Sequence, residues 1–423
     1  MNVIQALRPT ALPAILFVLW WPLFMWLPRR FAREFFALTG LLTVTLVAGP
    51  LLAIGLAAAI LLAYPIVEGI ARLKTGRRPV LVLFLLLLHA GYWGTFYLPL
   101  PRAFAMADLR PADQSAAFVL FSGIGVSFIR LLSFVWDRLR PGAAAVPFRD
   151  YLAYMLFFPQ FRHGPVERCQ PFAAQLTHAR DAWQPRDAGV GLLRIFIAFS
   201  TLLLMLGAAH VAAQHMSFPI NNVSLDAVTH PEQLSALETI LLIHAPLLLL
   251  YILESSFARL QLGVSRVFGV RGTENFRYPL LARSPREIWH RWNISVSTWL
   301  RDYVYFPLGG GRHHKYRNII LTFAYCGVLH ALQWRCLAWG LWTGGTLALL
   351  LWVSEKLKRP ADQPPRPRHP ALRAILAALA WLATYEWMCI GVTIILDPDT
   401  CGARLLVRYL GILTGGLIAW PAS

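Results

Sequence analysis

Cysteine is scarce in this chain of 423 residues, which contains five cysteines and no C-x-x-C pair. An odd number without paired spacing argues against a disulfide framework and against a structural zinc site. The sequence also lacks an H-E-x-x-H motif, the helical pair of histidines that zinc proteases use. Function classes that depend on disulfides, structural zinc or metalloprotease chemistry are therefore disfavoured.

Acidic residues are also few, since 21 Asp and Glu oppose 39 Lys and Arg and give a net charge of +18. Such a charge could suggest nucleic acid binding, but the basic residues stand in short groups between apolar runs rather than in one polar domain. That arrangement is the one that sets membrane topology. Because 57% of the residues are hydrophobic, the sequence predicts a polytopic membrane protein with no nucleic acid partner.

The apolar runs predict about ten to eleven membrane spans of roughly 20 residues each. The runs cover 11–27, 36–67, 80–98, 116–136, 189–213, 237–257, 319–353, 374–396 and 405–420. Gly49 and Pro50 interrupt the second run, so we expect a hairpin of two short helices there. The run 319–353 is too long for one untilted crossing and predicts either a strongly tilted helix or a broken pair. Arginines after the first run, without a cleavage site, predict a retained first helix with the N-terminus outside.

Segment 275–312 is an island of polar and aromatic residues in this apolar chain, which makes it the first place to look for chemistry. Ser284 can cap a helix that begins at Pro285, with Glu287 at the third helical position as in a capping box. We therefore predict one amphipathic helix over 285–303. Its apolar arc carries Trp289, Trp292, Val296, Trp299 and Leu300, one polar row holds Arg291, Ser295, Thr298 and Asp302, and the other holds His290, Asn293, Ser297 and Arg301. Periodicity alone favours an interfacial helix that Trp and Arg anchor at headgroup level.

Three histidines, His89, His244 and His330, lie inside apolar runs. An ionisable side chain at membrane depth costs about 3 kcal/mol and usually faces a cavity. The alternative for each is a neutral imidazole that bonds a backbone carbonyl. From their surroundings in the sequence alone the three histidines are equivalent.

The run EIWHRWNISVSTWLRDYVYFPLGG at 287–310 resembles the signature segment of the membrane-bound O-acyltransferases, the MBOAT family, and especially of its bacterial branch that acylates cell-envelope polymers. FFPQFRHGPVERCQPF at 157–172 resembles the family's F-P-x-x-x-x-G-P-x-x-R-x-x-x-F element. Gly327 to His330, with Trp339 and Gly340, resembles its histidine-bearing segment. The resemblance thus extends over three ordered segments, 157–172, 263–312 and 327–340.

This resemblance implies an all-α polytopic fold in which the signature helix and His330 line a passage through the bilayer. An acyl thioester, acyl-CoA or another, enters from the cytoplasmic side, and its acyl group passes to a hydroxyl of an envelope polysaccharide, polymer or lipid. No cofactor is expected, because a thioester is already activated. His330, the one intramembrane histidine in a family motif, is the expected general base, whereas His89 and His244 are expected to be structural. Asn293 occupies the position of the family's second functional side chain, where an amide can donate to a carbonyl or orient an imidazole.

The remaining candidate substrate-binding residues flank Asn293 in the signature run: Trp289, His290, Trp292, Ser297, Trp299, Arg301 and Asp302. Bacterial envelope enzymes commonly have His where Asn293 stands and often Arg where His290 stands, so the acceptor stays open. Arg271 and Arg277 belong to a basic zone, 259–286, that we expect to form a cytoplasmic mouth for an anionic donor. The alternative for this zone is plain topology signalling.

We expect one polytopic domain over 1–423, with N-terminal helices in 1–145, the family-matching catalytic region in 146–355 and C-terminal helices in 356–423. The expected location is the bacterial inner, or cytoplasmic, membrane, with the lipid bilayer, the thioester donor, the hydroxyl-bearing acceptor and envelope-biosynthesis proteins as partners. The rival interpretation is a multi-pass transporter or flippase that binds its cargo through intramembrane polar residues. No internal repeat is visible, and the polar residues gather in one half of the chain, which favours the enzyme.

Overall fold

The computed structural model describes residues 17, 20–48, 50–73, 75–95, 123–161, 164–215, 234–357, 369–396 and 401–415. Within these residues every regular element is a helix. Five of the described helices contain segments long and apolar enough to cross a membrane: Ala53–Arg72, Pro185–Ala208, Ala236–Val267, Trp334–Lys356 and Pro370–Leu396. The all-α, multi-pass architecture that the apolar runs predicted is therefore confirmed. The start of the predicted first helix 11–27, the loops near 99–113 and 217–233, the centre of the linker 356–373 and the turn 397–399 lie outside the described residues.

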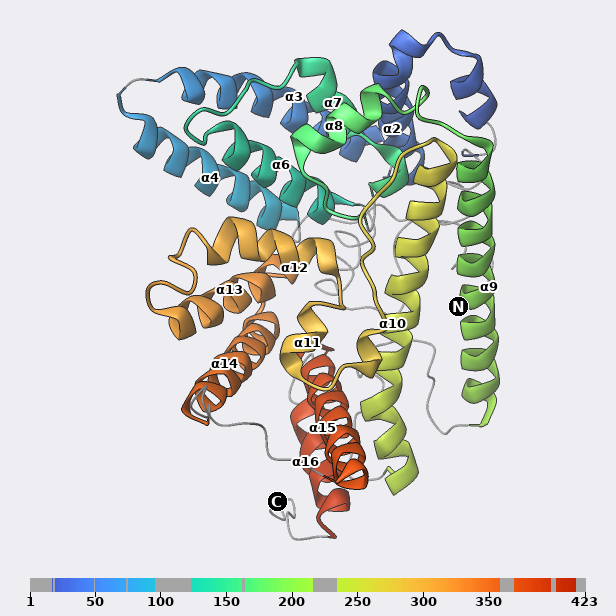
Figure 1. Cartoon of the computed structure of the whole chain (residues 1–423), viewed down its shortest axis with the longest axis vertical. Helices are drawn as coiled ribbons and strands as arrows, with labels where there is room; N and C mark the ends of the chain where they lie inside the picture. Colours follow the sequence, from blue (N-terminus) through green and yellow to red (C-terminus); the bar gives the residue numbers. More distant parts are fainter. Residues whose placement is uncertain are drawn as a thin grey trace. The chain divides into compact units, whose positions relative to one another are not determined.

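The chain divides into two compact units. Unit 1 comprises Met1–Ser200 and Ser256–Glu274, and unit 2 comprises Thr201–Ser255 and Asn275–Ser423. Figure 1 shows the course of the chain with its helices labelled.

Unit 1 contains α2 (Ala32–Ala48), α3 (Pro50–Arg72), α4 (Arg77–Gly94), α6 (Ile124–Arg138), α7 (Phe148–Met155) and α8 (Cys169–Thr177), with the start of α9 (Pro185–His215) and the end of α10 (Ala236–Val267). The predicted hairpin is present, because α2 ends at Ala48 and α3 begins at Pro50. A cluster of buried phenylalanines forms much of the core, with Phe36 meeting Phe157 at 5.0 Å and Phe268 at 6.0 Å between ring centroids. This core joins the 157–172 element to the end of α10.

Arg130 of α6 is fully buried and organises the same element from inside. Its guanidinium donates to the carbonyl oxygens of Tyr154 at 3.1 Å and Pro165 at 3.4 Å, and to the side-chain oxygen of Gln160 at 3.1 Å. A buried charge is tolerated only where such acceptors surround it. Arg130 therefore fixes the path of the 157–172 element, a role that the sequence did not single out.

Unit 2 contains α11 (Pro285–Trp289), α12 (Ile294–Leu300), a π-helical turn (Arg301–Tyr305), α13 (Lys315–His330), α14 (Trp334–Lys356), α15 (Pro370–Leu396) and α16 (Cys401–Leu413), with parts of α9 and α10. The long run 319–353 forms two helices with a break between them, which is one of the two predicted alternatives. The break leaves α13 and α14 antiparallel, since Gly327 lies against Cys336 and Gly340 against Phe323. A Cβ added to Gly327 would come within 2.1 Å of the Cys336 carbonyl oxygen, so these two helices pack at a distance that only glycine allows.

The prediction of one continuous helix over 285–303 is wrong. Its start is as expected, because the Ser284 hydroxyl accepts the backbone N–H of Glu287 at 3.2 Å. The helix nevertheless ends at Trp289, and the chain passes through Asn293 in the left-handed region, with φ of 43°, before α12 begins.

Tertiary hydrogen bonds explain this break. The backbone N–H groups of Ile294 and Ser295 donate to the backbone and side-chain oxygens of Asn275, at 3.0 and 3.1 Å. The carbonyl of Arg291, which a continuous helix would pair with Ser295, instead accepts the N–H of Arg277 at 2.9 Å. Each of the two polar rows predicted for one helix is consequently interrupted by the break between α11 and α12.

Candidate active site

His330 is the last residue of α13, and its side chain is exposed at the point where the chain turns into α14. The imidazole meets the indole of Trp339 edge-on, with ring centroids 5.4 Å apart and an interplanar angle of 90°. Edge-to-face contact of this kind orients a ring without using its nitrogens for hydrogen bonds. The imidazole thus combines a fixed orientation with an accessible surface.

Trp339 also contacts the signature segment, because the indole of Trp289 lies 6.3 Å from it and 4.4 Å from the ring of Phe323. Two of the three segments singled out in the sequence, the signature run and the histidine-bearing run, therefore meet through Trp339. The Trp289 Nε1–H is buried and has no hydrogen-bond partner within the described part of the chain. A buried donor in that condition is a candidate for pairing with a bound substrate.

Asn293 is the half-buried N-cap residue of α12, and its side chain does not cap the helix. Its carbonyl accepts the N–H of Ser297 at 2.9 Å, and the Ser297 hydroxyl donates to the Trp292 carbonyl at 3.1 Å. Among the described residues no hydrogen bond or ring contact joins Asn293 to His330. A catalytic role for Asn293 therefore stays a prediction.

The other predicted substrate-binding residues divide by burial. Trp299 is 2% exposed and packs on Tyr303 at 5.5 Å, so its indole supports the segment from within. Trp292 is half-buried between Phe276 and Tyr251, at 5.3 and 5.9 Å. His290 and Arg301 are exposed, and Arg301 donates to the half-buried Asp302 at 2.8 Å.

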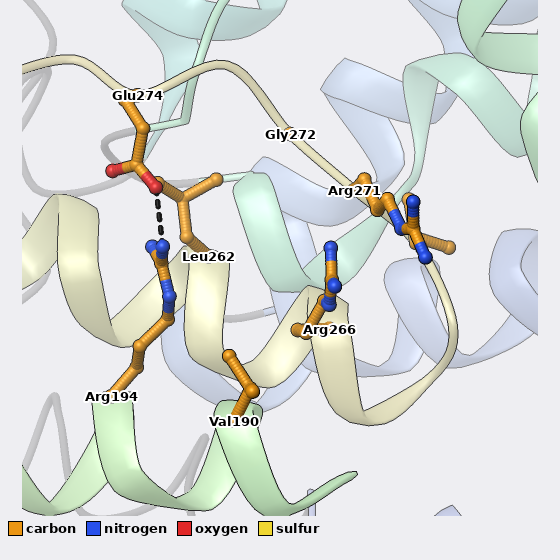
Figure 2. A pocket seen from close by; sticks show the side chains of 8 residues that line it. Val190, Arg194, Leu262, Arg266, Arg271, Gly272 and Glu274 are labelled. Atoms are coloured by element: carbon orange, nitrogen blue, oxygen red, sulfur yellow. Dashed lines mark hydrogen bonds and ion pairs between the residues drawn. The ribbon is translucent and has the colours of Figure 1, made fainter. Parts of the chain in front are cut away.

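The two predicted donor-mouth arginines belong to different units. Arg277, in unit 2, exchanges bonds with Arg291, which accepts its N–H at 2.9 Å and donates to its carbonyl at 3.3 Å. Arg271, in unit 1, lines a cavity of about 110 Å³ with Val190, Arg194, Leu262, Arg266, Val270, Gly272 and Glu274. Figure 2 shows this cavity with the side chains that surround it.

His89 and His244 each make the backbone-carbonyl contact expected of them, through Nδ1 to Leu85 and Ile240, both at 2.7 Å. His244 differs from His89 because its Nε2 also lies 3.2 Å from Glu386 Oε1. Tyr409 completes the group, with its hydroxyl 2.8 Å from Glu386 Oε2 and 3.3 Å from His244 Nε2.

Sequence reasoning missed the group that His244, Glu386 and Tyr409 form. The sequence does contain an indication of this group, because Glu386 is the one acidic residue in the apolar run 374–396 and a carboxylate at membrane depth needs a partner. Within the described residues no three His, Cys, Asp or Glu side chains are placed to hold a metal ion.

Comparison with known proteins places these features in a family context. The family model described as MBOAT, the membrane-bound O-acyltransferase family, matches residues 116–392. A protein of Azotobacter vinelandii named "Probable alginate O-acetylase AlgI" is 32% identical over 232 residues, which are 53% of this chain and 44% of that protein. The peptidoglycan O-acetyltransferase of Helicobacter pylori is 27% identical over 246 residues, which are 57% of this chain and 42% of that protein.

The teichoic acid D-alanyltransferase of Bacillus subtilis is 25% identical over 294 residues, which are 64% of this chain and 68% of that protein. The chain spans about half the length of the alginate and peptidoglycan proteins that it matches. The family match covers the 157–172 element, the signature segment and His330 together.

Proposed function

This chain belongs to the membrane-bound O-acyltransferase family, and from that premise we propose that it moves an acyl group from a thioester donor to a hydroxyl of an envelope polysaccharide, polymer or lipid. The names of its relatives support a polymeric acceptor, since they refer to alginate, peptidoglycan and teichoic acid. The proposed location is the bacterial inner membrane, with the donor supplied from the cytoplasm and envelope-biosynthesis proteins as partners.

The observation that carries the proposal is the contact of both Trp289 and His330 with Trp339. It joins the signature segment to an exposed, oriented imidazole at one place in unit 2. Acyl transfer needs a base at the acceptor hydroxyl and a donor group at the carbonyl oxygen. An exposed imidazole suits the first task, because neutral histidine can accept a proton near physiological pH.

The reaction follows from these roles. The His330 imidazole takes the proton of the acceptor hydroxyl as its oxygen attacks the thioester carbonyl. The C–S bond then breaks, and the proton passes to the departing thiolate, so the products are an O-acyl ester and a free thiol. The Asn293 amide would stabilise the developing oxyanion or orient the imidazole. Arg271 and Arg277 would attract the anionic donor.

Acyl incorporation by the purified protein tests this proposal. The full chain is reconstituted in vesicles and supplied with radiolabelled acetyl-CoA and, separately, alginate, peptidoglycan or teichoic acid. The expected result is label that stays with one polymer and is released by mild alkali, as an ester is. His330→Ala serves as the inactive control.

The same vesicles test the rival function. A transporter or flippase would move an acceptor across the bilayer without forming an ester. Suppose that unmodified polymer or lipid crosses the bilayer without any acyl donor and that no label is incorporated. That result would contradict the acyltransferase function and support the transporter function. Mass spectrometry of envelope glycans and lipids from cells with and without this chain would then identify the acceptor or cargo.

A further inference from the structure

The arginine cavity of unit 1 lies where α9 begins and α10 ends. Arg194 extends from α9, Arg266 from the last turn of α10, and Arg271 from the segment that follows (Figure 2). Both helices contain candidate membrane spans, Pro185–Ala208 and Ala236–Val267. The end of α10 belongs to the basic zone 259–286, for which the sequence predicts a cytoplasmic position. The cavity therefore lies at the ends of two spans, where a membrane protein meets anionic ligands.

Two carboxylates partly neutralise the three guanidinium groups. Glu274 Oε1 lies 2.5 Å from Arg194 Nη2, and Asp187 Oδ1 lies 2.6 Å from Arg266 Nε. The same Asp187 oxygen is 3.7 Å from Arg271 Nη2, which is too long for a hydrogen bond. Three positive and two negative groups leave one excess positive charge. Since the Arg271 side chain is 64% exposed, its N–H groups can turn to a ligand.

The backbone that carries Arg271 is held firmly in place. The Gln175 side chain bonds it twice, accepting its N–H at 2.5 Å and donating to its carbonyl at 2.8 Å. Two residues later, the N–H of Thr273 donates to Glu167 at 2.7 Å. Between them, Gly272 lies so close to α10 that an added Cβ would come within 2.6 Å of a Leu262 methyl carbon. The cavity is thus a preformed site rather than the gap under a loose loop.

The volume of the cavity and the guanidinium groups that line it indicate which kind of ligand it binds. The cavity has a volume of about 110 Å³, which is room for a small group of several heavy atoms. One tetrahedral phosphate group fits that space. Guanidinium groups bind phosphate oxygens through paired, charge-assisted hydrogen bonds.

We propose that this cavity binds a phosphate group of the acyl donor. The inference rests on the proposed thioester donor, because CoA and the phosphopantetheine arm of a carrier protein both join their thiol to a phosphate. It goes beyond a general basic mouth, since it assigns the contact to Arg271 with Arg194 and Arg266 and gives no part in it to Arg277.

Three acetyl donors that differ in their phosphate groups test whether the cavity binds the donor phosphate. Acetyl-CoA and acetyl-phosphopantetheine carry the phosphate, and acetyl-pantetheine lacks it. The KM of the wild-type enzyme should be about tenfold lower for each phosphorylated donor than for acetyl-pantetheine. Arg271→Gln should reduce that preference to less than about threefold. Arg186→Gln, an exposed α9 arginine that does not line the cavity, should leave the preference unchanged.

Binding gives a second readout that needs no turnover. Isothermal titration of the full chain with 4′-phosphopantetheine should show affinity that Arg271→Gln weakens about tenfold and Arg186→Gln does not. If the wild type transfers no acyl group from any donor but this binding is present, the proposed function fails and the phosphate site stands.

Other results overturn the inference. Equal use of all three acetyl donors by the wild type, or an equal loss for all three in Arg271→Gln, would mean that the arginines serve only their ion pairs. A lipid source is distinguished by native mass spectrometry from phosphatidylglycerol and phosphatidylcholine nanodiscs. Arg271-dependent retention of phosphatidylglycerol, without any donor preference, would assign the cavity to a lipid headgroup instead.

Discussion

The imidazole of His330 and the indole of Trp339 meet at right angles, 5.4 Å apart between centroids. Trp339 stands on α14 and also contacts Trp289 of the signature segment. A Cβ added to Gly391 of α15 would lie 3.6 Å from Trp339 Nε1, so a third element flanks the same indole. The orientation of the proposed base therefore depends on one aromatic side chain shared by several family elements.

His330→Ala should lower the rate of acyl transfer by about 10² to 10⁴, the range typical for loss of a general base. Because the side chain is exposed at a helix end, thermal unfolding in detergent should change little. His89→Ala should instead lower the unfolding temperature and keep its turnover per folded molecule, since its ring packs against Phe128 at 5.1 Å. Near-normal turnover of His330→Ala would remove His330 from the mechanism.

Trp339→Leu should reduce kcat about threefold to tenfold, because an edge-to-face pair contributes about 0.5–1.5 kcal/mol to holding the imidazole. The KM for the donor should not change, and Trp339→Phe should restore most of the rate. Trp352→Leu, on the same helix and 46% exposed, is the matched control. A rise in donor KM without a fall in kcat would show that Trp339 binds substrate rather than positioning the base.

Asn293 can be tested without straining the backbone. Its φ of 43° is favourable for glycine and unfavourable for alanine. Asn293→Gly should therefore keep the fold while lowering turnover at saturating donor by about 10 to 10³, as expected for a lost partner of the carbonyl or imidazole. Asn293→Ala should add a stability loss of about 1 kcal/mol, and Asn293→His should keep partial activity.

His290→Ala is the companion variant to Asn293→Gly, and it should change turnover only slightly. His290 is exposed at the end of α11, and the break after Trp289 separates it from Asn293. A large loss in His290→Ala, with little in Asn293→Gly, would transfer the role to His290 and imply a mechanism with two histidines.

Glu386→Ala should lower stability rather than turnover. Its carboxylate receives the Tyr409 hydroxyl at 2.8 Å and faces His244 at 3.2 Å. Removing it takes the carboxylate acceptor from the Tyr409 hydroxyl and the charged partner from His244, at a cost of about 1–3 kcal/mol. Thermal unfolding measures this loss, and Tyr409→Phe should show a smaller one. If Glu386→Ala unfolds like the wild type but is inactive, the cluster takes part in the reaction.

Local chemistry explains what the sequence could predict. Hydropathy identified the membrane class, Gly49 and Pro50 marked the hairpin between α2 and α3, and Ser284 marked the start of α11, because each of these signals acts within a few neighbouring residues. The same holds for the three histidines in apolar runs, since an imidazole there is conspicuous whatever surrounds it, but only the family resemblance distinguished His330 from the other two.

Only the tertiary structure decided how these pieces meet. The signature helix breaks at Asn293 because Asn275, far back in the chain, takes the N–H groups that a continuous helix would use internally. Glu386 and His244 are 142 residues apart, so no local pattern could pair them. The charge pattern located the basic zone, but it could not say that Arg271 would share Asp187 with Arg266, whereas Arg277 would pair with Arg291. Periodicity records what one helix prefers, and contacts between distant segments override it wherever they offer the backbone better partners.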